Sequence, residues 1–100
     1  MVRFLSEEFP VTGESSDFLY TAVLAADGRR ITLGGTDAEV FQYESTKAMD
    51  AGKEMMERIG STFGFEYAVH SNGTFVLSIN ISVARDTEEA ERIARRFSRF

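Results

Sequence analysis

Residues 74–84 read TFVLSINISVA, and this stretch decides the predicted fold. Large apolar residues occupy every second position, namely Phe75, Leu77, Ile79, Ile81 and Val83. Because successive side chains of a strand point to opposite faces, this strict alternation predicts a strand that is buried on one side only. The other side of the same strand carries Val76, Ser78, Asn80, Ser82 and Ala84.

The turn before this strand decides which face the preceding residues take. A two-residue turn would place the apolar residues of segment 65–69 and those of the 74–84 strand on opposite faces. A three-residue loop over 71–73 instead pairs Val69 with Phe75 and gathers both apolar sets on one face. We therefore predict the three-residue loop, which directs His70 away from the helices.

An Asp27-Gly28 pair separates two β-prone segments, residues 18–26 and 29–33. Asp-Gly is a preferred sequence for the two-residue type I′ turn that closes a hairpin. The sequence therefore predicts a hairpin at this point, with Leu24 opposite Ile31.

The N-terminal residues give weaker signals. Residues 2–5 (VRFL) are β-prone and are predicted as a brief edge strand or an ordered arm. Residues 6–17 hold the only proline and a Gly-Glu-Ser-Ser cluster, the composition of a connecting loop. We treat residues 1–100 as a single α+β domain in which 1–17 form an N-terminal arm and loop.

Residues 36–45 leave two interpretations open. Thr36 and Glu39 could form a capping box that opens one long helix. The β-prone residues Val40, Phe41 and Tyr43 favour a strand over 39–44 instead, followed by a helix over 46–58. A helical apolar stripe supports that second helix start, and Gly60 is the expected residue after its end.

The last element is predicted as an amphipathic helix. Asp86 is the expected N-cap, with Glu89 at the capping-box position. Apolar residues then recur at helical spacing, at Ala90, Ile93, Ala94 and Phe97. Acidic residues early in this helix and arginines late in it match the helix dipole.

Two amphipathic helices and two hairpins predict an α+β fold. The economical arrangement is a two-layer sandwich, an antiparallel-rich sheet with two helices packed on one face. The order from residue 40 to residue 97 matches most of a ferredoxin-like split pattern, with the N-terminal hairpin free to take the place of its last strand.

Composition excludes several function classes. The chain has no cysteine and one histidine, which disfavours disulfides and sulfur- or nitrogen-rich metal sites, and we predict no cofactor. The formal net charge of −5 disfavours direct nucleic-acid binding. No apolar run approaches the length of a membrane-spanning helix, and the first residues lack the apolar stretch of a signal peptide, so a cytoplasmic location is expected.

No catalytic, cofactor-binding or metal-binding residue is predicted. His70 is interpreted as a solvated turn residue, because no nucleophile and base can be ordered around it. Gly34-Gly35 lacks the spacing of a phosphate-binding loop and is read as a turn. The enzyme question stays open, with a non-enzymatic protein favoured.

The sheet face left free by the helices is the predicted interaction surface, because it is less polar than a face that only meets water. An acidic helix face is a second candidate surface. The alternative is that the N-terminal segment, with Phe4, Phe9 and Val11, covers the free face. The residues predicted to bind a partner are Leu19, Thr21, Val23, Arg30, Thr32, Val76, Ser78 and Asn80 on the sheet, and Asp50, Glu54 and Glu57 on the helix.

The favoured function is a small protein-interaction domain, either an acidic inhibitor or accessory protein or a homodimer. One alternative is a small-molecule-binding or enzymatic domain, with a pocket between sheet and helices lined by Tyr20, Tyr43, Tyr67 and methionines. Another is an engineered α+β protein without natural function.

Overall fold

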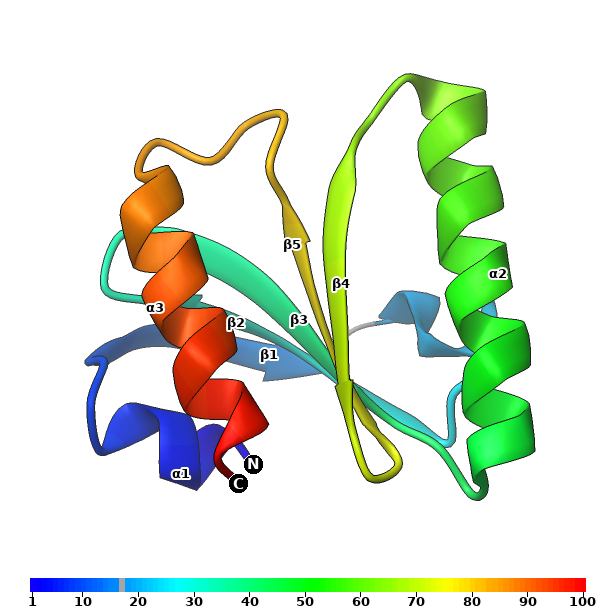
Figure 1. Cartoon of the computed structure of the whole chain (residues 1–100), viewed down its shortest axis with the longest axis horizontal. Helices are drawn as coiled ribbons and strands as arrows, with labels where there is room; N and C mark the ends of the chain where they lie inside the picture. Colours follow the sequence, from blue (N-terminus) through cyan, green and yellow to red (C-terminus); the bar gives the residue numbers. More distant parts are fainter. Residues whose placement is uncertain (17) are drawn as a thin grey trace.

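A five-stranded antiparallel sheet forms the centre of the molecule, with the strand order β1-β2-β3-β5-β4 (Figure 1). The structure is a computed structural model and describes residues 1–16 and 18–100. Side chains are described for all residues except 16–19. In chain order, its elements are α1 (Val2–Ser6), β1 (Val11–Ser16), the 3-10 helix η1 (Phe18–Thr21), β2 (Asp27–Leu33), β3 (Thr36–Gln42), α2 (Thr46–Phe63), β4 (Tyr67–Asn72), β5 (Phe75–Asn80) and α3 (Thr87–Ser98).

The predicted α+β fold, an antiparallel sheet with two helices packed on one face, is confirmed. The two helices that share a face are α1 and α3, which contact each other as well as the sheet. The sequence led us to expect α2 and α3 as this pair, but α2 packs on the opposite side chains of the strands. Their main cluster joins Leu5 and Phe97 to the strand residues Leu33, Leu77 and Ile79. Arg96 of α3 holds α1 in place, with its guanidinium 3.7 Å from the centre of the Phe4 ring.

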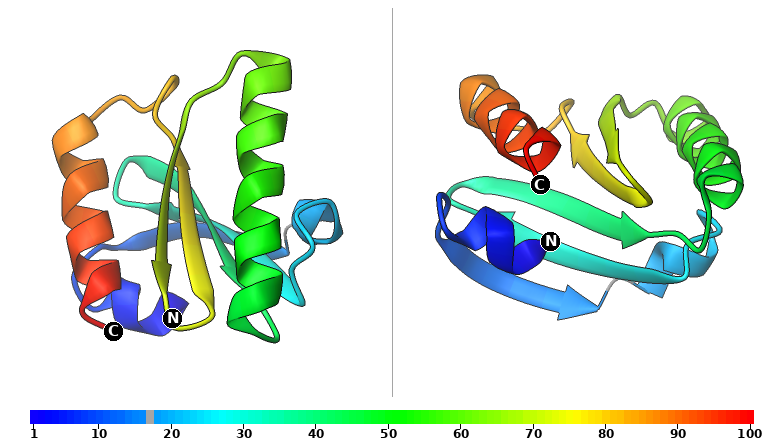
Figure 2. Two further views of the ribbon diagram at one scale, coloured as in Figure 1. Left: turned by 45° about the vertical axis from the view of Figure 1, so that its right-hand side comes forward. Right: turned by 60° about the horizontal axis from the view of Figure 1, so that its bottom comes forward.

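Helix α2 packs against the strand side chains that point away from α1 and α3. Its residues Met49 and Met56 cluster with Phe41 of β3 and Val76 of β5. These strand residues alternate with those that meet α3, because neighbouring side chains of a strand point to opposite sides. Accordingly, α2 and α3 lie on either side of the β4–β5 hairpin (Figures 1 and 2).

The C-terminal part of the sheet has a split βαβ arrangement. Strand β5 lies between β3 and β4 and is antiparallel to both, so β3 and β4 run in the same direction, connected by α2. Strand β2 pairs with β3 on its other side, where the ferredoxin-like pattern would place a strand after α3. A strand over part of 36–45, rather than one long helix, is confirmed by β3.

The predicted hairpin at Asp27-Gly28 is wrong. Both residues belong to β2, and the hairpin of β2 and β3 closes at Gly34-Gly35, with Leu33 opposite Thr36. A side chain at position 28 would lie 2.8 Å from Tyr20 and 2.9 Å from Phe41, so this glycine permits close packing rather than a turn. Residues 18–21, which the sequence placed in the first strand of that hairpin, form a 3-10 helix instead.

The predicted three-residue loop over 71–73 is also wrong. Asn72 pairs with Phe75, which leaves a two-residue turn at Gly73-Thr74, and the φ of +61° at Gly73 is the conformation that such a turn needs. Val69 therefore faces Ser78 instead of Phe75. His70 faces Leu77, which places it on the side of α3, contrary to the prediction.

Four element boundaries also differ from the prediction. The strand predicted over 74–84 ends at Asn80, so Val83, expected on its buried face, is 67 % exposed. Residues 2–6 are helical rather than extended, because Leu5 and the following Phe9 become buried when one turn of helix packs on α3. Residues 11–16 form β1 rather than a loop. Helix α2 passes Gly60 and ends at Gly64, whose φ of +74° makes it the left-handed C-cap.

Candidate functional site

The side of the sheet that faces α2 is divided into an apolar and a polar half. One row of residues runs across the strands from Gly28 through Phe41 to Val76, as the strand register shows. Helix α2 and Val23 cover this row, so Phe41, Val76 and Val23 are buried. The apolar half is therefore used for internal packing.

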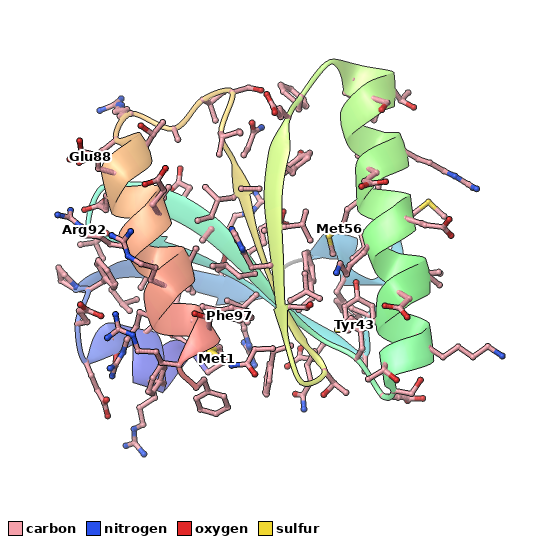
Figure 3. The ribbon with its side chains drawn as sticks, in the orientation of Figure 1. Met1, Tyr43, Met56, Glu88, Arg92 and Phe97 are labelled. Atoms are coloured by element: carbon pink, nitrogen blue, oxygen red, sulfur yellow. The ribbon has the colours of Figure 1, made fainter. Side chains whose placement is uncertain are left out.

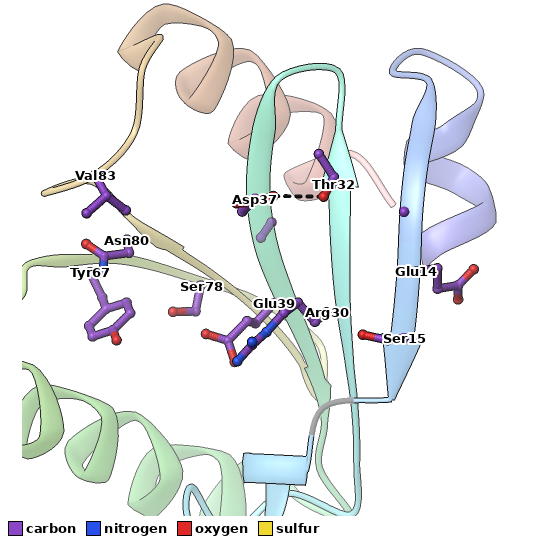
Figure 4. Close-up of a pocket in the computed structure, with 12 residues that line it drawn as sticks. Glu14, Ser15, Arg30, Thr32, Asp37, Glu39, Tyr67, Ser78, Asn80 and Val83 are labelled. Carbon is purple, nitrogen blue, oxygen red and sulfur yellow. Dashed lines mark hydrogen bonds between the residues drawn. The ribbon is translucent and has the colours of Figure 1, made fainter.

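The next two rows are polar and, apart from the buried Ser78, their side chains are partly or fully exposed. Arg30, Glu39 and Ser78 lie opposite one another on β2, β3 and β5. Beyond them, Thr32 lies opposite Asp37, and Asn80 lies opposite Tyr67. These residues line a hollow of about 460 Å³ (Figure 4). Leaving out Tyr67, we call six of them the polar strip, namely Arg30, Thr32, Asp37, Glu39, Ser78 and Asn80.

A hydrogen bond joins two residues of the polar strip. The Thr32 hydroxyl donates to a carboxylate oxygen of Asp37 over 2.8 Å. Arg30 and Glu39 are direct cross-strand neighbours, and both side chains are engaged in interactions. Ser78 is 3 % exposed, and within the described part of the chain no hydrogen bond involves its hydroxyl. A buried hydroxyl without a partner is uncommon in proteins.

A second cavity, of about 360 Å³, adjoins the hollow beneath α2. Glu39, Tyr67 and Ser78 line both spaces, so the two adjoin at these residues. The remaining wall of the second cavity is apolar and consists of Ala22, Val23, Phe41, Met56, Ile59 and Phe63. Together the two spaces form an amphipathic cleft.

Two tyrosines beside this cleft have perturbed acidity. Burial raises the pKa of Tyr67, the negative charge of Glu39 raises it further, and Arg30 opposes this shift. Burial raises the pKa of Tyr43 to about 12. The Tyr43 hydroxyl donates to the backbone oxygen of Val23 over 2.9 Å, and the side chain lies between α2 and the sheet (Figure 3). Tyr43 is therefore a structural residue rather than a reactive one.

Glycines bring α2 close to the sheet. A side chain at position 52 would collide with the Tyr43 hydroxyl and would lie 2.5 Å from the backbone oxygen of Val23. A side chain at position 60 would lie 2.9 Å from the backbone oxygen of Phe65. These two buried positions let α2 lie close to Tyr43, Val23 and the segment that leads into β4.

Large apolar side chains are exposed around Tyr67, at the edge of the cleft. Phe63 is 68 % exposed and Val83 is 67 % exposed. Phe63 lines the apolar cavity, Val83 lines the polar hollow, and the ring of Phe65 lies 6.5 Å from that of Tyr67. We call Phe63, Phe65 and Val83 the apolar rim.

The structure brings some predicted partner-binding residues together and separates others. Arg30, Thr32, Ser78 and Asn80 share the polar hollow. Val23 and Val76 are buried under α2, so they are not available on a free face. Thr21 is exposed at the end of η1, and the side chain of Leu19 lies outside the described part of the structure.

The predicted acidic helix surface is exposed but mixed in charge. Asp50, Glu54 and Glu57 are all exposed on α2. Arg58 borders the same shallow hollow as Glu54 and Glu57, and Lys53 lies 3.5 Å from the Ser71 hydroxyl of β4. Partner binding by these carboxylates stays a prediction.

The N-terminal segment does not cover the polar strip, contrary to the alternative considered from the sequence. Leu5 and Phe9 pack into the cluster on the α3 side of the sheet, and Phe4 and Val11 lie against the same cluster. The strip therefore remains open.

Sequence reasoning did not place Asp37 or Glu39 in a binding site, and it named Tyr67 only as a wall of the alternative pocket between sheet and helices. A signal was present, because charged residues alternate with Ala38 and Val40 in the segment TDAEV. That alternation indicates a polar face of a strand, but only the register of β3 with β2 and β5 aligns this face with Arg30 and Ser78.

Other kinds of site find no support in the described residues. Among them, no three His, Asp or Glu side chains come together as a possible metal site. Over the same part of the chain, no helix combines the length and apolar composition needed to cross a membrane. Comparison of the chain with protein-family models, curated proteins and solved structures gave no significant match.

Proposed function

We propose that this protein is a non-enzymatic interaction domain that binds another protein through the apolar rim and the adjoining polar strip. The observation that carries this proposal is the exposure of Phe63, Phe65 and Val83 at one edge of an uncovered sheet face. Clustered exposed apolar side chains bordered by polar groups are typical of protein contact sites. The cleft behind the rim gives a partner side chain a place to insert.

The charges around the rim indicate a basic partner. Glu57 and Glu66 border a small hollow shared with Phe65, and Glu39 lines the cavity beside Phe63. The whole chain has a formal net charge of −5. Opposite charge across an interface speeds association and excludes partners of like charge. A partner with arginine or lysine around an apolar anchor therefore fits this surface.

The test is affinity capture with the full chain and a rim variant, Phe63→Ser with Val83→Ser. We expect the double substitution to reduce recovery of the partner at least tenfold, because it removes the apolar contact. The matched control is Phe100→Ser, since Phe100 is 56 % exposed but contacts Phe4 and Phe75 at another part of the molecule. Circular dichroism verifies that all variants are folded.

Sedimentation equilibrium distinguishes a different partner from a second copy of the chain. Self-association that is lost in the rim variant would identify the partner as the chain itself. Recovery of the same proteins by the wild type and the rim variant, together with a monomeric wild type, would contradict the proposed surface.

A further inference from the structure

The cleft behind the apolar rim has the architecture of a small-molecule site. Its apolar part encloses about 360 Å³, and its polar part about 460 Å³. Pockets that bind small ligands commonly enclose several hundred Å³, are mostly apolar and contain a few polar groups that fix orientation. Here those groups are Glu39, Tyr67 and Ser78, which lie where the two parts meet.

The size and walls of the apolar part suit an aromatic body. An apolar cavity of about 150 Å³ accommodates benzene, so about 360 Å³ has room for one or two fused rings. Phe41, Phe63 and Tyr67 contribute aromatic walls, with Met56 and Ile59 from α2. Aromatic rings and a thioether pack favourably on a flat aromatic ligand.

The charges of the polar part favour a cationic end. The residues of β2 and β3 that line this hollow include two carboxylates, Asp37 and Glu39, and one cation, Arg30. An ionised carboxylate offers about four acceptor positions, so one carboxylate can accept hydrogen bonds from several donors at once. The buried hydroxyl of Ser78 supplies a second polar group at the junction.

We propose that the two cavities form one binding site for a small aromatic amine. The ring occupies the apolar cavity under α2, and the ammonium group donates hydrogen bonds to Glu39 and to the hydroxyl of Ser78. The aromatic faces of Tyr67 and Phe63 add cation–π attraction when the amine lies between them. This site shares Phe63, Glu39 and Ser78 with the surface proposed for a protein partner, but most of its apolar wall, including Phe41, Met56 and Ile59, lies behind the rim.

Three probes with one ring system and different charge test the proposal. They are tryptamine, 3-ethylindole and indole-3-propionate, measured by isothermal titration calorimetry and thermal unfolding of the full chain at pH 7. We expect tryptamine to bind most tightly and indole-3-propionate at least tenfold more weakly, with 3-ethylindole between them. Bound ligand should raise the unfolding temperature in the same order.

Variants then locate the site. Glu39→Gln should reduce tryptamine affinity about tenfold and leave 3-ethylindole unchanged, a difference that a general loss of folding would not produce. Ile59→Trp should fill the apolar cavity and abolish binding of all three probes. Glu54→Gln is the matched control, because this carboxylate is on α2 but outside both cavities, and it should change neither affinity.

Several results would overturn the amine site. Tighter binding of indole-3-propionate would show that Arg30 selects an acid, and equal binding of all three probes would show that no polar group contributes. Absence of binding by every probe would also reject it. None of these results bears on capture of a protein partner by the rim, so the two proposals fail independently.

Discussion

The two sides of the sheet differ in how completely they are filled. Of the eight largest side chains with less than 2 % exposure, seven belong to the cluster under α1 and α3, and only Val76 belongs to the cluster under α2. The seven are Phe97, Leu5, Ile31, Leu33, Leu77, Ile79 and Ile93. The α3 side therefore carries most of the hydrophobic stabilisation, although a surface hollow of about 600 Å³ also lies there, between α3 and β4. On the α2 side the cavity reaches the buried residues Phe41, Met56 and Ser78.

The helices themselves account for this difference. Helix α3 presents Ala90, Ile93 and Phe97 as a continuous apolar stripe that fits the sheet. Helix α2 buries two methionines and two glycines, which contribute little branched apolar volume. A side that relies on close backbone approach and flexible methionines can leave a cavity that borders its buried residues.

The largest expected effect comes from truncating the α3 side. Phe97→Ala should lower the free energy of unfolding by about 3 to 5 kcal/mol, because it leaves a large cavity in the filled cluster. Met56→Ala removes a buried residue from the α2 side and should cost closer to 2 kcal/mol, since Met56 already borders an empty cavity. Urea unfolding measures both values, and a larger loss for Met56→Ala would reverse the comparison.

A polar contact also fixes the α3 side. The carboxylate of Glu89 accepts hydrogen bonds from the Gly35 backbone N–H over 3.0 Å and from the Thr36 hydroxyl over 2.5 Å. Glu89→Ala would leave the hydroxyl of Thr36, 3 % exposed, without this partner. We expect a loss of about 2 to 3 kcal/mol in urea unfolding. Glu88→Ala, at an exposed neighbouring position, is the control and should cost under about 1 kcal/mol.

These contacts show where the sequence was sufficient and where it was not. The alternation of Phe75, Leu77 and Ile79 and the Asp86 N-cap were predicted correctly, because each depends on local pattern. The predicted capping-box role of Glu89 was wrong, because its carboxylate accepts a hydrogen bond from Thr36 in the β2–β3 hairpin, 53 residues away along the chain. Local pattern does not determine a partner that distant.

The hairpin errors have a different physical origin. Gly28 was read as a turn residue, but its function is to let Tyr20 and Phe41 approach β2. Strand β4 lies between α2 and α3, so Tyr67, Ala68 and Val69 are all half-buried and their sequence shows no alternation that fixes a face. The same missing information hid the contribution of Glu39 to the cleft, which depends on the register of β3 with β2 and β5.

The glycines of α2 give a direct way to disturb the looser side. Glycine to alanine in a helix normally stabilises by up to about 1 kcal/mol. Gly52→Ala should instead destabilise by about 1 to 3 kcal/mol, because the added methyl group collides with Tyr43 and Val23. Ser61→Ala, at an exposed position of α2, should change the free energy of unfolding by under about 0.5 kcal/mol. Stabilisation by Gly52→Ala would show that α2 can move away from the sheet.

Tyr43 makes the α2 side sensitive to alkaline pH. Its pKa is about 12 in the folded chain, against about 10 when unfolded, so the unfolded state loses its proton first. The contribution is complete below pH 10 and is lost as the pH rises toward 12. At pH 11, linkage gives a loss of about 1.4 kcal/mol relative to pH 8.

Tyr43→Phe is the variant that isolates this effect. It removes the hydrogen bond to Val23 and should cost about 1 kcal/mol at pH 8. Its free energy of unfolding should then fall less than that of the wild type between pH 8 and pH 11. An unchanged difference between the two proteins across this range would contradict the assigned pKa.

The smallest effect on stability should come from the apolar rim. Phe63 is 68 % exposed, so Phe63→Ser removes little buried area and should change the free energy of unfolding by under about 0.5 kcal/mol. Because Phe63 also lines the apolar cavity, the same substitution should weaken binding of 3-ethylindole while the fold stays intact. A large loss of stability would mean that Phe63 belongs to the packing of α2, and the loosely filled side would then have no residue free for binding at its edge.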